Sequence, residues 1–173
     1  MPHAAQLRTV SDERLLAQCR VEAFRGPGPG GQKRNKTSSA VRITHVASGL
    51  CAIAGESRSQ HRNKAAALWR LRHRLAVELR ESIDVSTFVP PPWLRQAISD
   101  QGRLDVPLHS ECYPQVMGLV LDVLSASGWR LSTAAALIGL STAHLVRFIE
   151  KDRKVWAKVN QMRPGSGHKT LHS

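Results

Sequence analysis

Apolar and polar residues alternate along two stretches in the first third of the chain. Residues 19–25 read CRVEAFR, with apolar side chains at every second position as far as residue 23, and residues 41–45 read VRITH. The second stretch is followed by the turn-forming letters ASG and then by LCAIA at residues 50–54. A period of two is typical of strands with one buried face, and a short turn between two such runs indicates a hairpin. The pattern therefore predicts a strand followed by a β-hairpin.

From about residue 60 the apolar period becomes that of a helix. Leu68, Leu75 and Leu79 recur at helical spacing, so we expect one face of this helix to pack on the small sheet. Its outer surface would carry four arginines, Arg62, Arg70, Arg74 and Arg80. These arginines form either a solvated face or a face that binds phosphates, and the pattern leaves both interpretations open.

A proline run, VPPP at residues 89–92, interrupts the helical pattern. Consecutive prolines resist both helix and central strand, so we interpret residues 86–105 as a linker. The chain would then have a first domain over residues 1–85 and a second domain over residues 106–173. The second domain is predicted to be helical, with a short C-terminal tail.

A helix-turn-helix pattern lies in the second domain. Apolar positions at helical spacing surround the turn Gly139-Leu140-Ser141, with Ser132 and Ser141 as predicted N-caps. Nucleic-acid contacts of the second helix could come from Arg147, Lys151, Arg153 and Lys154. Two helices packed in this way also occur in domains that touch no nucleic acid. The predicted fold class is α+β: a small mixed or antiparallel sheet packed by a long helix, followed by an all-α, helix-turn-helix-like domain.

The overall charge favours a polyanionic partner. The 173 residues include 25 lysines and arginines against 13 aspartates and glutamates, which gives a net charge of +12. Both halves of the chain are basic, the first more so. Nucleic acid and an anionic membrane surface would both suit such a charge.

Cysteine usage and hydropathy indicate a protein of a reducing compartment. Cys19, Cys51 and Cys112 are odd in number and far apart, so they suggest neither a disulfide framework nor a metal site of C-x-x-C type. The N-terminal residues lack the features of a secretory signal, and no run approaches the roughly 18 apolar residues of a membrane span. We therefore expect a cytoplasmic protein without a membrane partner.

A loop rich in glycine and proline, GPGPGGQKRNKTSSAVRI, occupies residues 26–43. A pair of glycines reaches positive φ without strain and lets another molecule approach the backbone closely. Taken alone, the glycines and prolines would favour an ordinary surface turn. The loop lacks the Lys-Ser/Thr pair of a phosphate-binding loop and the distal acid of a dinucleotide site, which argues against nucleotide binding.

Two segments in order resemble the catalytic domain of class I peptide-chain release factors, and most closely the small ribosome-rescue peptidyl-tRNA hydrolases. The first segment holds Gly30-Gly31-Gln32 followed by Asn35-Lys36-Thr37. The second holds Arg58-Ser59-Gln60-His61 followed by Asn63-Lys64 at the start of the long helix. The resemblance extends from about residue 19 to residue 79, and it implies ribosome-dependent hydrolysis of the ester that joins nascent peptide to tRNA.

The resemblance assigns catalysis to Gly30, Gly31 and Gln32 in the peptidyl-transferase centre. Water attack on the ester puts negative charge on the carbonyl oxygen, and the backbone N–H of Gln32 would stabilise it. The Gln32 side chain would place water and exclude other nucleophiles. Because the ribosome and the tRNA would supply the rest of the site, no cofactor or metal is expected and the isolated protein should be nearly inert.

The resemblance also implies contacts to ribosomal RNA and a brace for the loop. Asn35 and Thr37 are expected to brace the loop by local hydrogen bonds. His45 and His61 are more consistent with structural roles than with acid–base catalysis. We expect the partners to be large-subunit ribosomal RNA and peptidyl-tRNA, bound by a monomer. The phosphate contacts would come from Lys33, Arg34, Lys36, Arg42, Arg58, Arg62 and Lys64, although each could instead be a solvated charge.

The chain departs from decoding release factors and from known rescue hydrolases. It leaves no room for stop-codon-reading domains, so we expect codon-independent rescue of stalled ribosomes. Its last residues supply only Arg163 and Lys169 as fixed cations in place of a long basic tail. Two alternatives remain at this point: a helix-turn-helix regulator that binds nucleic acid, and a ribosome-binding protein without hydrolytic activity.

Overall fold

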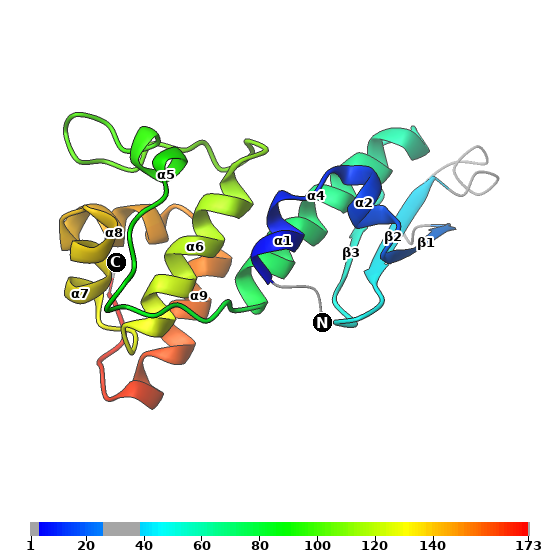
Figure 1. Ribbon diagram of the computed structural model, residues 1–173. Helices are drawn as coiled ribbons and strands as arrows, with labels where there is room; N and C mark the ends of the chain where they lie inside the picture. Colours follow the sequence, from blue (N-terminus) through cyan, green and yellow to red (C-terminus); the bar gives the residue numbers. More distant parts are fainter. Residues whose placement is uncertain (1–3, 26–38, 173) are drawn as a thin grey trace. The chain divides into compact units, whose positions relative to one another are not determined.

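The computed structural model describes residues 4–25 and 39–172. The chain divides into two compact units, Met1–Glu78 and Leu79–Ser173. The first contains a three-stranded antiparallel sheet covered by a long helix, and the described part of the second is built of helices (Figure 1). The predicted α+β fold class is therefore confirmed.

The sheet of the first unit has the strand order β1-β2-β3. Its strands are β1 (Cys19–Phe24), β2 (Ala40–His45) and β3 (Cys51–Ala54), and both pairings are antiparallel. Across the sheet the register pairs Val21 with Ile43. Val41 and Ile43 are buried while Arg42 between them is exposed, as the period of two predicts. The predicted first strand and hairpin are confirmed.

The turn between β2 and β3 is held by backbone bonds and by His45. The Gly49 N–H donates to the His45 carbonyl at 2.9 Å, and Gly49 has a φ of 70°, which favours glycine. The buried His45 ring places Nδ1 2.8 Å from the Ser48 hydroxyl. Its Nε2 is buried without a hydrogen-bond partner among the described residues. His45 is thus part of the core, and burial lowers the pKa of its ring below the usual 6.5.

Lowering the pH should destabilise the first unit through His45. Since the folded pKa lies below 6.5, the unfolded chain binds this proton more readily than the folded one. The contribution of neutral His45 is complete above the unfolded pKa and is lost as the pH falls toward the folded pKa. In thermal unfolding at several pH values, the unfolding temperature of His45→Gln should fall less on acidification than that of the wild type. The exposed His61, changed to Gln, is the control; equal pH slopes for wild type and His45→Gln would contradict the assignment.

Helix α4 (Gln60–Glu78) covers β2 and β3, and its leucines form the core of the unit. Helices α1 (Ala4–Thr9) and α2 (Asp12–Leu16) precede β1, and α1 packs on α4. Arg72 lies on the buried side of α4, where it donates to the Leu7 carbonyl at 3.2 Å and to the Asp12 carboxylate at 2.8 Å. Arg72 thus ties both short helices to α4.

Two arginines of α4 cover the outer edge of β3. Arg70 donates to the Ile53 carbonyl at 2.7 Å, and Arg74 donates to the Cys51 carbonyl at 2.8 Å. Carbonyls two residues apart on a strand face the same side, so these two lie on the edge away from β2. Arg70 also pairs with Glu56 at 2.7 Å and thereby holds the pKa of that carboxyl below its usual value. These two arginines therefore form neither a simple solvated face nor a free phosphate site.

The prediction that Arg80 lies on the outer surface of the long helix is wrong. The helix ends at Glu78, and Arg80 belongs to the second unit. There its guanidinium is 3.2 Å from the carboxylate of Asp122, a residue almost fully buried. The backbone N–H of Glu81 donates to the same carboxylate oxygen at 3.0 Å. Asp122 thus fixes the start of this unit onto the helix that carries it.

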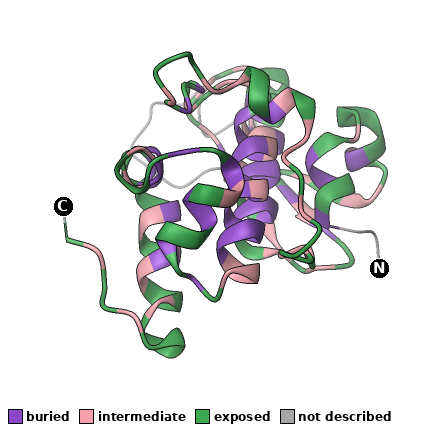
Figure 2. Cartoon of the chain, turned by 60° about the vertical axis from the view of Figure 1, so that its left-hand side comes forward, coloured by how far each residue is buried: buried purple, intermediate pink, exposed green. Residues whose placement is uncertain are grey.

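The second unit packs its helices around α6. Buried and exposed positions lie on different faces of the helices, as Figure 2 shows. Val120 and Leu124 of α6 are fully buried, as are Ile138 and Ile149. The helices are α5 (Pro92–Gln96), α6 (Tyr113–Ala126), α7 (Leu131–Ile138), α8 (Thr142–Glu150), α9 (Arg153–Met162) and the 3-10 turn η1 (Pro164–Ser166).

The stretch interpreted as a linker is folded over much of its length. Proline is well suited to the first turn of a helix, and Pro92 begins α5. Leu94 is fully buried and Leu104 nearly so, and a β-bridge joins Ile98 to Leu104. Residues 92–104 are therefore anchored to the second unit by their apolar side chains, which the prolines mask in the sequence.

Helices α7 and α8 form a helix-turn-helix corner. Gly139 has a φ of 88° and ends α7, and the Ser141 hydroxyl accepts from the His144 N–H at 3.2 Å. The two helices bend by 98°, which lies in the range of helix-turn-helix motifs. The predicted cap Ser141 is confirmed, whereas Ser132 as a cap is wrong, because α7 already begins at Leu131.

The cations predicted for the second helix of this corner are divided between two helices. Arg147 is on α8 and Lys151 directly follows it, but Arg153 and Lys154 begin α9. The break occurs at Asp152, whose carboxylate accepts from the N–H groups of the first turn of α9 at 2.9 and 3.4 Å. The prediction of one helix carrying all four cations is therefore wrong.

Asp152 should contribute strongly to the stability of the second unit. Besides capping α9, its carboxylate accepts from the buried hydroxyl of Tyr113 at 3.1 Å, and burial together with this carboxylate raises the pKa of Tyr113. Asp152→Ala removes both roles, so we expect a loss of about 2–4 kcal/mol in the free energy of unfolding. Ser141→Ala removes one simple cap and should cost only about 1 kcal/mol in the same denaturant titration. Similar losses in both variants would contradict the dual role of Asp152.

The C-terminal tail returns along α9. The Asn160 side chain accepts from the Leu171 N–H at 2.6 Å, and Arg163 donates to the Trp129 carbonyl at 2.8 Å. Trp129 is buried with a φ of 61°, and the His168 ring lies 3.1 Å from the Gly128 carbonyl. The tail therefore holds the left-handed turn between α6 and α7.

Among the described residues, no single helix is both long and apolar enough to cross a membrane. The pair α7 and α8 meets the length and composition criteria only when the two are taken together across their 98° bend.

Candidate functional site

The glycine loop connects two neighbouring strands at one end of the sheet. β1 ends at Phe24, β2 begins at Ala40, and the register pairs these two residues. The loop therefore leaves and re-enters the sheet at adjacent strand ends. Outside the described residues lie all eight predicted loop positions: Gly30, Gly31, Gln32, Lys33, Arg34, Asn35, Lys36 and Thr37.

Asn63 fixes the point at which the chain returns from the loop. Its side-chain amide donates to the Ser39 carbonyl at 2.6 Å and to the Ser57 carbonyl at 2.8 Å, and its carbonyl oxygen accepts from the Ser57 N–H at 3.0 Å. Asn63 is almost fully buried in the first turn of α4. One buried side chain therefore joins the loop end, the turn after β3 and the long helix.

The turn before α4 supports the same point. The Ser59 hydroxyl accepts from the Arg62 N–H at 3.3 Å, and the Ser59 N–H donates to the Ser57 hydroxyl at 3.1 Å. Gly55 lies against the start of β2, where a Cβ on Gly55 would be 3.1 Å from the Cβ of Ala40. The segment that carries the second sequence signature thus forms the cap of α4 and packs beside the loop end.

Four predicted phosphate-binding residues lie around this loop end, and all four are exposed: Arg42, Arg58, Arg62 and Lys64. Arg42 is two residues from the start of β2, and its guanidinium lies 5.3 Å from the ring centre of Phe24. Arg62 and Lys64 flank Asn63 in the first turn of α4, which contains no acid. Cations there are opposed by the helix dipole, so their position does not serve helix stability. The negative charges of a polyanion would interact favourably with all four side chains.

The predicted histidines lie in the first unit, and the remaining predicted cations lie in the second. His61 is exposed at the start of α4, whereas His45 is buried in the sheet. Within residues 4–25 and 39–172, no group of three or more His, Cys, Asp or Glu residues could hold a metal ion. Arg153 and Lys154 are exposed on α9, and Arg147 and Lys151 line a hollow on the second unit.

Sequence reasoning missed the role of Asn63. The residue stands inside the second signature, but a polar side chain at a helix start gives no sign of three buried hydrogen bonds. The available signal was an amide on the buried side of α4, four residues before Ala67 and five before Leu68. A buried amide needs partners, and here those partners are the loop end and the preceding turn.

Comparison with known proteins places residues 15–86 in the RF-1 domain. Peptide chain release factor 1 of Solidesulfovibrio magneticus is 48% identical over 75 residues, which are 43% of this chain and 20% of that protein. The Leptothrix cholodnii protein of the same name is 51% identical over 65 residues, 38% of this chain and 18% of the relative. Peptide chain release factor 1 of Zymomonas mobilis is 46% identical over 83 residues, which are 48% of this chain and 22% of that protein.

The chain spans about a fifth of the length of these relatives, and the domain match ends within the first residues of the second unit. Within that range lie the sheet, α4, the buried Asn63 and the glycine loop. Over residues 15–86, the chain is therefore similar to the RF-1 domain that class I peptide-chain release factors contain.

Proposed function

We propose that this protein hydrolyses the ester of peptidyl-tRNA on the ribosome and so releases the nascent peptide. The observation that carries the proposal is the RF-1 domain match over residues 15–86, which includes Gly30-Gly31-Gln32. The described scaffold supports it, because strands, helix cap and Asn63 all converge on the end of this loop.

The reaction needs little ionisable chemistry from the protein. Water attacks the ester carbonyl carbon, the bond to the tRNA ribose oxygen breaks, and that oxygen receives a proton. Negative charge develops on the carbonyl oxygen, where the Gln32 N–H would donate a hydrogen bond. Gly30 and Gly31 would let this backbone approach the substrate more closely than a Cβ permits. The Gln32 side chain would place the attacking water.

Binding of ribosomal RNA would be carried by the cations around the loop. Arg42 lies in β2, Arg58 in the turn before α4, and Arg62 and Lys64 in the first turn of α4, and all four are exposed. Contacts to phosphates give position and salt-dependent affinity without reading a base sequence. Lys33, Arg34 and Lys36 would extend this surface along the loop, while Asn35 and Thr37 would brace it. The protein would act in the cytoplasm, as a monomer.

We further propose that release does not depend on a codon and rescues stalled ribosomes. The second unit is a helical body whose exposed cations suit backbone phosphates, and such contacts carry no sequence information. Its helix-turn-helix corner is the one feature that favours a second function, a regulator that binds duplex DNA. Sequence-selective binding of duplex DNA would support that alternative.

The test is peptide release from purified ribosomes that carry labelled peptidyl-tRNA. Three messages are compared, one truncated at the decoding site, one with a sense codon there and one with a stop codon, each with and without the protein. We expect release on the truncated message. Release at stop codons alone would overturn codon independence, and binding without release on any message would identify a ribosome-binding protein that lacks the reaction.

A further inference from the structure

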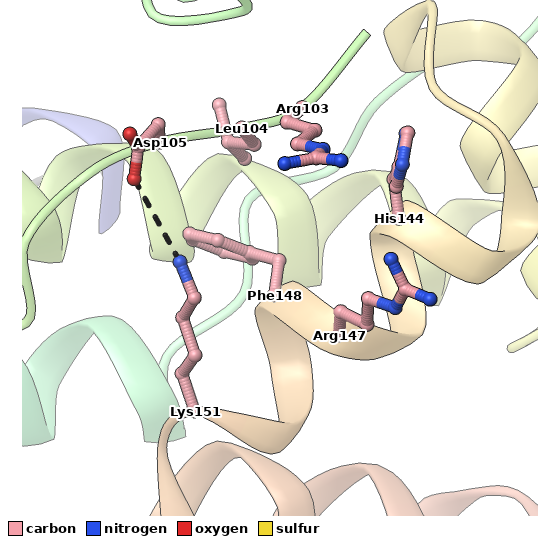
Figure 3. A pocket seen from close by; sticks show the side chains of 7 residues that line it. All are labelled: Arg103, Leu104, Asp105, His144, Arg147, Phe148 and Lys151. Atoms are coloured by element: carbon pink, nitrogen blue, oxygen red, sulfur yellow. Dashed lines mark ion pairs between the residues drawn. The ribbon is translucent and has the colours of Figure 1, made fainter. Parts of the chain in front are cut away.

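A basic hollow of about 270 Å³ lies on the second unit, between residues 103–105 and one face of α8. Figure 3 shows Arg103, His144 and Arg147 at one end of this hollow and Asp105 with Lys151 at the other. Four of these five side chains carry nitrogen groups, and only one carries a carboxylate. The composition of the lining therefore suits an anion.

The two arginines of the hollow are not neutralised by the protein. Arg103 and Arg147 are exposed, and neither guanidinium hydrogen-bonds or pairs with an acid among the described residues. The carboxylate of Asp105 is 3.8 Å from the Lys151 ammonium, at the opposite end. Two like charges that share one concave surface repel each other, and an anion between them would remove this repulsion. The arginines are thus placed for a ligand with a planar or tetrahedral set of oxygens.

His144 adds a hydrogen-bonding ring nitrogen to the lining of the hollow. Its Nδ1 lies 2.7 Å from the Gly102 carbonyl, which can only accept, so Nδ1 carries the hydrogen. The other ring nitrogen of neutral His144, Nε2, is then a hydrogen-bond acceptor. A ribose 2′-hydroxyl can donate to such an acceptor, whereas deoxyribose has no hydroxyl at that position.

The chain around the hollow argues against reading of DNA bases by this face of α8. In a DNA-binding helix-turn-helix the second helix enters the major groove with its reading face free. Here residues 102–105 lie along the face of α8 that carries His144 and Lys151. Leu104 and Phe148 are buried at this contact. The cations at the rim of the hollow can reach the phosphate backbone of a nucleic acid. This face of α8, however, cannot enter the major groove of DNA.

We propose that this hollow binds a phosphodiester group of RNA. Arg103 and Arg147 donate to the phosphate oxygens, and His144 accepts from the neighbouring 2′-hydroxyl. The inference deepens the proposed function, and rests on it in naming the partner as ribosomal RNA: the second unit holds the chain on the RNA backbone while the first acts on the ester.

The test measures binding of the full chain to a short fluorescein-labelled single-stranded RNA by anisotropy, over a series of salt concentrations. Arg103→Gln and Arg147→Gln should each weaken binding about tenfold, because each removes a charge-assisted hydrogen bond. The slope of log affinity against log salt should fall by about 0.7 per lost phosphate contact. Arg130→Gln is the matched control, since Arg130 is exposed in the same unit outside the hollow and carries the same charge. It should change the affinity by less than about twofold.

Equal losses in Arg130→Gln and Arg147→Gln would overturn the inference, because binding would then follow net charge alone. Equal affinity for DNA of the same sequence, single-stranded or duplex, would overturn the role of the 2′-hydroxyl. The assay contains no ribosome and no peptidyl-tRNA, so it reports on the hollow even if the protein releases no peptide. Thermal unfolding of each variant checks that these exposed substitutions leave the fold intact.

Discussion

Gly31→Ala should lower the rate of peptide release by at least about a hundredfold and leave ribosome binding nearly unchanged. The glycine stands next to Gln32, whose N–H is proposed to stabilise charge that exists only in the transition state. A methyl group at this point would keep the backbone away from the ester and so remove the stabilisation. The cations proposed to bind RNA are other residues, so affinity for the ribosome should persist. The measurements are single-turnover release and co-sedimentation with ribosomes.

Gly165→Ala provides the matched control for this substitution. Gly165 lies in η1, has no positive φ, and has open space where a Cβ would stand. The control variant should release peptide at the wild-type rate. If Gly31→Ala also kept that rate, the assignment of catalysis to the Gly-Gly-Gln sequence would be removed.

Asn63→Ala should lower the saturated rate of release by about tenfold to a hundredfold, because Asn63 is expected to act by positioning the end of the proposed catalytic loop. Its side chain makes three hydrogen bonds that fix Ser39, the residue at the loop end, to the turn at Ser57. Without them the loop would be less well placed, and errors of about 1 Å in placement can cost a hundredfold in rate. The same change should reduce the free energy of unfolding by about 2–4 kcal/mol. Release is therefore measured well below the unfolding temperature.

The separation of rate from binding makes this prediction specific. A protein that is merely less stable would recover the full rate at saturation, whereas a misplaced loop would bind at the same concentration and react slowly. Asn160→Ala is the control, because Asn160 also joins two segments through its amide, here α9 and the tail. It should leave the saturated rate unchanged. A wild-type saturated rate in Asn63→Ala would show that the bonds to Ser39 and Ser57 serve stability alone.

The elements that position the loop could be predicted from the sequence because they follow simple periods. The alternation in residues 41–45 and 50–54 and the leucine spacing after residue 60 each report a single buried face. Strand β2 and helix α4 satisfy those patterns with little interference from other groups. The caps Gly139 and Ser141 could also be predicted, since each acts on backbone groups within one turn of the chain.

Polar residues with distant partners could not be predicted in this way. Arg72 and Asn63 are buried because Leu7, Asp12 and Ser39 supply partners far along the chain. Periodicity treats such side chains as exposed, since it contains no information on those partners. Arg80 was misplaced for the same reason: its fate is decided by a buried carboxylate about forty residues later.

Runs of proline and glycine carry little information on structure where buried apolar residues are few. The VPPP run suggested a linker, and Leu94 and Leu104 hold the residues after it to the helical core. The sequence predicts only a short tail at the C-terminus, yet Asn160 and Arg163 bind its backbone. In both segments one or two side chains determine the structure. The composition of a segment does not show the effect of so few residues.

The guanidinium cover on β3 bears on how this protein behaves at high concentration. An uncovered strand edge invites pairing with the edge of another molecule, which is a route to aggregation. Arg70 and Arg74 already occupy two outward carbonyls of β3, so a second chain would have to displace both before a ladder could form there. The two arginines thus protect this edge against pairing with a strand of another molecule, and no additional strand or loop is needed to cover it.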